Sequence, residues 1–242
     1  MGKYKGSIFG LAWTFFSPLL MLAVYTFVFS VVFKARWVGG TDSKTEFALV
    51  LFAGLMTFQF FSECTTRAPG LIFENPNFVK KIVFPLEILP IVCMCVALFT
   101  FCTNFLVWLA FYFVFFGIPP STIFLLPLCA IPLILGTLGT SWILTALGVY
   151  LRDIAQAIGV FTSALMFLSP VFYPVSALPE TYRPALQFNP LTSIIERIRG
   201  VMIWGVTPRW EELLVSIAIS FLFAFFGYRV FQKARKGFAD VL

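Results

Sequence analysis

Long uncharged apolar runs alternate with short charged segments along the whole chain. The first such run covers residues 7–33 and follows Lys3 and Lys5. A helix needs about 20 apolar residues to cross the hydrocarbon core of a bilayer, which is about 30 Å thick. By this criterion the pattern predicts six membrane-spanning helices, at approximately residues 7–33, 47–64, 90–116, 122–149, 154–170 and 210–231.

Three of these spans, the second, third and fourth, need a further argument. Residues 47–62 form a short uncharged run, so we expect the second helix to continue past Glu63. Its carboxylate then lies at the membrane interface or turns toward the protein interior. Residues 88–151 contain no charged side chain and are too long for one helix, but the cluster GIPPS at 117–121 predicts a turn that divides them into two spans.

Closely spaced prolines follow the fifth predicted span and preclude one straight helix there. Asn189 and Pro190 predict the N-cap and the first residue of a short helix over 191–204. Apolar residues recur in it at helical spacing, which predicts an interfacial or re-entrant helix rather than a span. The charged residues expected elsewhere on its surface are Glu196, Arg197 and Arg199.

The longest charged interruption, residues 63–90, lies between the second and third predicted spans. It contains Glu63, Arg67, Glu74, Lys80, Lys81 and Glu87. These charges cannot all remain in hydrocarbon, so the segment must lie at a membrane surface, where a partner can push on it. Ten of the 17 Lys and Arg residues fall on the same side, which predicts that this side and both termini are cytoplasmic.

Composition supports a polytopic all-α membrane protein that forms one transmembrane domain, 1–242. The chain is 60% hydrophobic and 12% charged, whereas soluble domains are about 25% charged. A net charge of +6 would suggest nucleic acid as a partner of a soluble protein. Here the basic residues flank apolar runs, as expected of cytoplasmic membrane borders, and we therefore predict no nucleic-acid partner.

The sequence lacks the usual equipment of an enzyme. It has no histidine, no P-loop motif and no carboxylate within the cores of the third to fifth spans. The five cysteines form no CxxC pair, so we expect small buried side chains rather than metal ligands. Glu63 and Glu87 lie near span ends, where an interfacial structural role or a proton relay is possible. We predict a non-catalytic protein that binds no cofactor and draws its energy from a partner.

Aromatic residues are abundant, with 32 Phe, 7 Tyr and 6 Trp. Most of them fit a role as lipid-facing bulk or interface anchors. Aromatic rings can also stack on the C–H faces of sugars, and a tyrosine hydroxyl can hydrogen-bond. The candidates for lining a substrate conduit are Trp13, Phe16, Tyr25 and Phe29.

Four stretches in a fixed order carry a resemblance to a known family. They are KYKGSIFGLAWTFFSPLLMLAVYTFVFSVVF, ENPNFVKKIVFPLEILP, GVYLRDIAQAIGVFTSALMFLSPVFYPVSALPE and FNPLTSIIERIRGVMIWG. With them the chain resembles ABC-2 type permease subunits that export lipid-linked polysaccharides such as O-antigen and teichoic acid. The resemblance implies six spans, a homodimer that encloses a conduit in the bacterial inner membrane, and two copies of a separate ABC ATPase that binds ATP and Mg²⁺.

The resemblance also assigns the ATPase contacts to the segment between spans two and three, which we call the coupling segment (residues 74–85). Asn75 and Pro76 can start a short helix over 78–84, and Pro85 can end it. A basic loop at lipid headgroups is the alternative for Lys80 and Lys81. The coupling residues are Glu74, Asn75, Pro76, Asn77, Phe78, Lys80, Lys81, Phe84 and Pro85.

The resemblance leaves three questions open. Family members usually carry an amphipathic helix before the residues that match KYKGS, where the printed sequence begins, so the expectation is a lost segment or a shortened form. No motif encodes the cargo, so a drug or a lipid is an alternative to a glycan. A membrane enzyme of glycan or lipid synthesis is the alternative from another class, and the missing acid, base and metal groups argue against it.

Overall fold

The computed structural model describes residues 44–75, 84–151 and 153–238. It also describes residues 16, 19–21, 23, 24, 27 and 28. The regular secondary structure of these residues is helical, and they include no β-strand. The all-α class is therefore confirmed for the described part. Apart from these few residues between 16 and 28, the first predicted span lies outside the described part of the chain.

Four of the described helices are long and apolar enough to cross a membrane. They are α2 (Lys44–Arg67), α4 (Ile88–Phe116), α5 (Leu126–Tyr150) and α9 (Trp210–Ala234). Short turns extend three of them, namely η3 (Ala68–Gly70), η4 (Ser121–Leu125) and η8 (Arg235–Gly237). The second, third, fourth and sixth predicted spans are thus found as helices, and α2 continues past Glu63 as expected.

The fifth predicted span, 154–170, is found only in part. Helix α6 (Ile154–Phe167) has 14 residues, which is about 21 Å at 1.5 Å per residue. This is shorter than the hydrocarbon core of about 30 Å. The chain leaves the helix at Leu168 and reaches Pro170 in a turn. A complete set of six spans therefore stays a prediction.

The proline-rich stretch after α6 breaks into short pieces, as its sequence predicts. They are η5 (Val175–Ala177), η6 (Glu180–Tyr182), α7 (Arg183–Gln187), α8 (Pro190–Arg199) and the π-helical turn η7 (Gly200–Trp204). The predicted N-cap is confirmed, because Asn189 Oδ1 accepts a hydrogen bond of 3.0 Å from the backbone N–H of Leu191.

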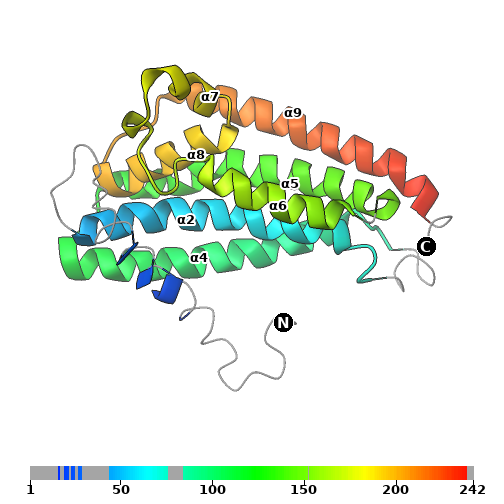
Figure 1. Ribbon diagram of the computed structural model, residues 1–242, viewed down its shortest axis with the longest axis horizontal. Coiled ribbons are helices and arrows are strands. Elements are labelled where there is room, and N and C mark those ends of the chain that lie inside the picture. The colour runs from blue at the N-terminus through cyan, green and yellow to red at the C-terminus, as the bar shows by residue number, and fades with distance from the viewer. Residues whose placement is uncertain are drawn as a thin grey trace.

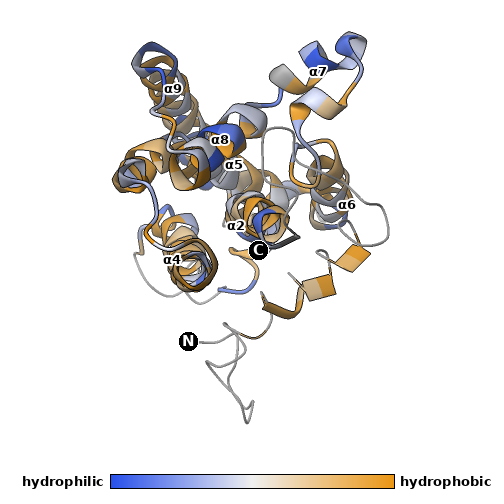
Figure 2. Cartoon of the chain, turned by 90° about the vertical axis from the view of Figure 1, so that its left-hand side faces the viewer, coloured by the Kyte–Doolittle hydropathy of each residue, from blue (hydrophilic) through white to orange (hydrophobic). Residues whose placement is uncertain are grey.

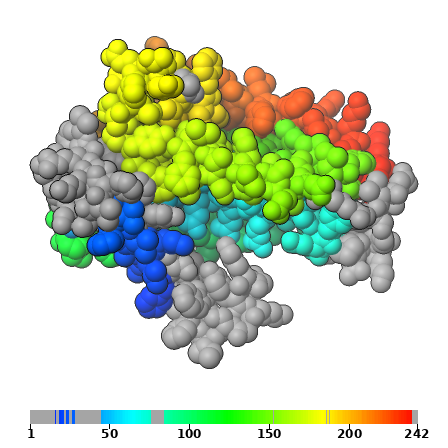
Figure 3. Space-filling model, viewed as in Figure 1, coloured from blue at the N-terminus to red at the C-terminus, as the bar shows by residue number. Residues whose placement is uncertain are grey.

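The long helices run side by side, and α2 lies in the middle (Figures 1 and 2). The end-on view shows α4, α5, α6 and α8 around it. In the most apolar window of α2, 67% of the residues are buried, against 17% for α9, which lies at the periphery beside α5. The space-filling view shows α6 across the face that includes parts of α2 (Figure 3). The central element is thus a helix rich in Phe and small residues.

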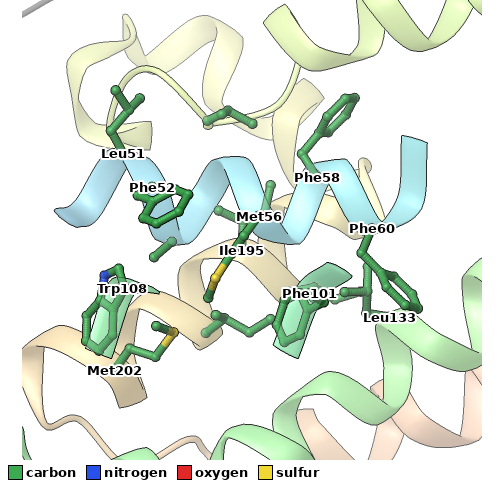
Figure 4. Packing of buried hydrophobic residues seen from close by; sticks show 14 of the residues in the cluster. Leu51, Phe52, Met56, Phe58, Phe60, Phe101, Trp108, Leu133, Ile195 and Met202 are labelled. Atoms are coloured by element: carbon green, nitrogen blue, oxygen red, sulfur yellow. The ribbon is translucent and has the colours of Figure 1, made fainter. Parts of the chain in front are cut away.

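Two groups of buried apolar side chains hold the bundle together. The first cluster joins α2, α4, α5 and α8 and includes Met56, Phe101, Trp108, Leu133 and Ile195 (Figure 4). The second cluster joins the segments beside the coupling segment to α5 and α9. Its buried members are Leu71, Ile72, Leu86, Leu89, Cys93, Trp142, Ala146, Val149, Ala224, Phe231 and Phe238.

Helices α5 and α9 approach each other closely because glycines face each other. A Cβ atom on Gly139 would lie 2.9 Å from Cα of Ala224, and one on Gly227 would clash with the backbone of Gly139. Backbone atoms cannot move aside as a flexible side chain can. The close contact therefore requires glycine at both positions, and it makes α5 and α9 one packed pair.

Candidate coupling site

The two flanks of the coupling segment lie at the same end of the bundle, at the right in Figure 1. Glu74 and Pro85 are exposed, and Phe84 is partly buried against the second cluster. Asn75 is partly buried, and the other five coupling residues lie outside the described part of the chain. They are Pro76, Asn77, Phe78, Lys80 and Lys81.

Turns shape the first flank. The backbone N–H of Glu74 donates to Gly70 O at 2.9 Å, and Asn75 Nδ2 donates to Leu71 O at 2.9 Å. On the other flank, Phe84 and Pro85 have no regular secondary structure. The short helix predicted over 78–84 stays a prediction, because most of it falls outside the described residues.

Apolar packing anchors both flanks. Leu71, Ile72 and Leu86 are buried in the second cluster, which also contains side chains of α5 and α9. Before Leu71, the carbonyl of Ala68 in η3 accepts a 3.0 Å hydrogen bond from Thr145 Oγ1 on α5. The coupling segment is therefore fastened at each end to the same two helices.

Glu87 adds polar links directly after the coupling segment, at the N-terminus of α4. Its carboxylate accepts a hydrogen bond of 2.7 Å from Arg235 Nη1 at the end of α9, and its backbone carbonyl accepts one of 3.1 Å from Trp142 Nε1 on α5. Partial burial alone would raise the pKa of Glu87, but hydrogen bonds from its own backbone, Gln232 and Arg235, with the Arg235 charge, lower it below its usual value. The carboxylate is therefore ionised at neutral pH.

Side chains of α5 and α9 continue this group of contacts. The rings of Trp142 and Tyr228 meet edge to face with centroids 5.2 Å apart, and Gln232 Nε2 donates to the Tyr228 hydroxyl at 2.8 Å. We call Glu87, Trp142, Tyr228, Gln232 and Arg235 the Glu87 network. Sequence reasoning placed Glu87 near a span end but missed its partners, because Arg235 lies 148 positions away.

At the opposite end the structure corrects a prediction. Arg199 was expected on the surface of the short helix, but its side chain is fully buried. It follows Ile195 by four residues, so it projects from nearly the same side of α8 as that core residue. The prediction placed Arg199 at the surface because the residue is charged, but tertiary packing buries it.

Every nitrogen of the Arg199 guanidinium donates a hydrogen bond. Nε donates to Val50 O at 3.0 Å, Nη2 to Val171 O at 2.7 Å, and Nη1 to Pro170 O and to Glu196 Oε1. Burial lowers the pKa of Arg199 to about 10, opposed by the nearby Glu196, so the group stays protonated at neutral pH. We call this set of contacts the arginine junction. It ties α2, the turn after α6 and α8 together.

Gly54 makes room for the arginine junction. A Cβ atom at this position of α2 would clash with the guanidinium of Arg199. The glycine therefore lets a planar cation lie directly against the backbone of the central helix. A signal existed in the sequence, since a glycine in an apolar helix often marks a close approach, but nothing in the sequence names the group that approaches.

Only some of the other predicted functional residues lie in the described part of the chain. Among the conduit candidates, Phe16 is 57% exposed, while Trp13, Tyr25 and Phe29 lie outside the described residues. Glu63 lies within α2 with its side chain 8% exposed, 4.0 Å from Arg67. In the part of the chain that the structure describes, no three His, Cys, Asp or Glu side chains gather as a metal site would need.

Known proteins are similar to this chain over nearly its whole length. The family model described as ABC-2 type transporter matches residues 2–203. Two proteins named O-antigen export system permease protein RfbA, from Klebsiella pneumoniae, are 28% and 26% identical to the chain over 242 residues, which is 99% of this chain and 90% of each relative. A protein of the same name from Myxococcus xanthus is 25% identical over 240 residues, 98% of this chain and 90% of the relative.

Proposed function

Because the chain belongs to the ABC-2 type transporter family, we propose that it is the membrane permease subunit of an ATP-driven exporter of lipid-linked, O-antigen-like polysaccharide. The observation that carries this proposal is the similarity to three O-antigen export permeases over at least 98% of the chain. The family and the permease names of these relatives support a transport subunit rather than an enzyme.

The proposed assembly is a homodimer in the bacterial inner membrane with two copies of an ABC ATPase on the cytoplasmic side. Each chain forms a single domain of six spans with both termini in the cytoplasm. ATP and Mg²⁺ are bound by the ATPase, and this chain binds no cofactor. The location of both flanks of the coupling segment at the same end of the bundle supports one docking surface (Figure 1).

The proposed mechanism is transmission of movement. ATP binding brings the ATPase subunits against the coupling residues Glu74 to Pro85, and the displaced segment shifts the spans to which it is fastened. The lipid-linked glycan then passes outward through a conduit between the two chains. Trp13, Phe16, Tyr25 and Phe29 are the proposed stacking surfaces along that path.

Substitution of the two basic coupling residues tests the docking surface. We expect Lys80→Gln together with Lys81→Gln, and separately Phe84→Ala, to reduce co-purification of the ATPase and the amount of surface polysaccharide, because each removes a contact to the partner. The matched control is Lys233→Gln with Lys236→Gln, two exposed basic residues at and just after the end of α9. Equal effects of both Lys pairs would support lipid headgroup binding instead.

Capture of the chain from native membranes tests the whole proposal. We expect a protein with a P-loop among the captured partners, and a block of polysaccharide export when the gene is deleted. Unchanged ATPase capture and unchanged polysaccharide in all coupling variants would contradict the coupling assignment. Export of a drug or a free lipid, with surface polysaccharide intact, would contradict the cargo.

A further inference from the structure

We infer that Glu87 is the residue that transmits displacement of the coupling segment to α9, through its ion pair with Arg235. This inference rests on the proposed function and assigns it a transmission route. Glu87 follows the coupling segment by two positions, and its neighbour Leu86 is buried in the second cluster. A movement at Pro85 therefore reaches Glu87 before it reaches any residue of α4.

Two separate bonds leave Glu87 in different directions. The backbone carbonyl is bonded to Trp142 of α5, and the carboxylate is bonded to Arg235 at the end of α9. Since Gly139 and Gly227 pack α5 and α9 backbone to backbone, both bonds lead to one packed pair of helices. The helices α5 and α9 are thus held together at their middle by glycines and at their end by Glu87.

The ion pair suits a link that changes during a cycle. The side chains of Glu87 and Arg235 are 21% and 41% exposed, so water can replace either partner when the bond opens. Gln232, which helps to lower the pKa of Glu87, donates from Nε2 to the Tyr228 hydroxyl one turn earlier on α9. The network therefore offers the Glu87 carboxylate a second polar partner on α9, Gln232, when the position of Glu87 shifts.

The backbone bond and the ion pair have different roles. The Trp142 bond is made to the Glu87 carbonyl, so it remains when the Glu87 side chain is replaced. Substitution of the carboxylate therefore removes the link to α9 and leaves the link to α5 in place. This separation lets an experiment test the ion pair without releasing the coupling segment.

The test compares transport per ATP hydrolysed in the complete complex of this chain with its co-purifying ATPase. Variants Glu87→Gln and Arg235→Gln each remove the ion pair, and the double variant Glu87→Arg with Arg235→Glu restores it with the charges exchanged. The control is Glu212→Gln, which removes the Arg209–Glu212 pair of 2.9 Å near the start of α9. Co-purification of the ATPase and the melting temperature are measured for every variant.

We expect both single variants to retain the ATPase and to lose at least about fivefold in transport per ATP, the lower limit of typical coupling between sites. The exchanged pair should recover most of this loss, and the control should match the parent. Transport per ATP within twofold of the parent in both single variants would overturn the inference. So would loss of ATPase binding in proportion to transport, since that would make Glu87 a docking residue. If the parent complex itself exports no glycan, the proposed function fails first.

Discussion

The two ends of the helical bundle are held together by different physical means. At one end a fully buried arginine donates to three backbone carbonyls, of Val50 in α2 and of Pro170 and Val171 after α6, and lies against Gly54 of the central helix. At the other end, apolar packing of the second cluster holds the helices, and the Glu87–Arg235 pair is partly exposed. A buried cation cannot leave its partners without a large penalty, whereas an exposed pair can exchange with water. The contacts at one end are therefore costly to break, whereas the ion pair at the other end can open at little cost.

The largest expected effect concerns the arginine junction. Arg199→Ala leaves the buried carbonyls of Pro170 and Val171 without their side-chain donor, removes the side-chain bond to Val50 and creates a cavity. We therefore expect a loss of about 3–5 kcal/mol in the free energy of unfolding. Unfolding in detergent micelles measures it. Arg209→Ala, at an arginine that is 84% exposed in its side chain, is the control and should change little. Equal losses in both variants would remove the distinction between the two ends.

The glycine contact between α5 and α9 should give the next largest effect. Gly227→Ala places a methyl group against the backbone of Gly139, and we expect about 2–3 kcal/mol of destabilisation from overpacking. Gly136→Ala on α5 is the matched control, because a Cβ there meets nothing within 4 Å. It should be neutral or raise stability by up to about 1 kcal/mol, since alanine favours helix over glycine. Similar melting temperatures of the two variants would contradict the close contact.

Loss of the Glu87 carboxylate should affect stability least. Because the pair with Arg235 is partly exposed, Glu87→Gln should cost less than about 1 kcal/mol at pH 7. The expected loss is therefore in transport per ATP and not in the melting temperature. A destabilisation as large as that of Arg199→Ala would show that this end is as rigid as the other.

Lowering the pH should remove even the small contribution of the Glu87–Arg235 pair to the free energy of unfolding. The pKa of Glu87 is lower in the folded protein than its ordinary value of 4.5, so the unfolded chain takes up the proton first as the pH falls. The stabilisation is complete above pH 4.5 and disappears as the pH falls through the folded pKa. Melting curves of the parent and Glu87→Gln should therefore differ at pH 7 and converge as the pH falls below the folded pKa of Glu87. A difference that grows in acid would contradict this sign.

Much of the fold follows from the sequence because membrane spans are dictated by local composition. The uncharged stretch 88–151 and its turn at 117–121 became α4 and α5, and Gly117 has the positive φ of 80° that such a turn uses. The N-cap at Asn189 was also local, and it was confirmed. The fifth span was predicted too long, because apolar composition alone does not reveal that α6 ends at Phe167.

The residues that hold the ends together could not be predicted in the same way. Arg199 lies 149 positions from Val50, and Glu87 lies 148 positions from Arg235. No periodicity connects partners so far apart, and a charged residue is by default assigned to the surface. The roles of Lys80, Lys81, Trp13, Tyr25 and Phe29 stay predictions, because those residues fall outside the described part of the chain.

Site-specific photo-crosslinking tests the central claim most directly. A benzoyl-phenylalanine is placed at Glu74, which is exposed beside the coupling segment, or at Ile118, which is 87% exposed at the opposite end. Irradiation of intact cells should give an adduct between the chain and an ABC ATPase from position 74 and none from position 118. An ATPase adduct from position 118, or no ATPase adduct from either position, would contradict the account.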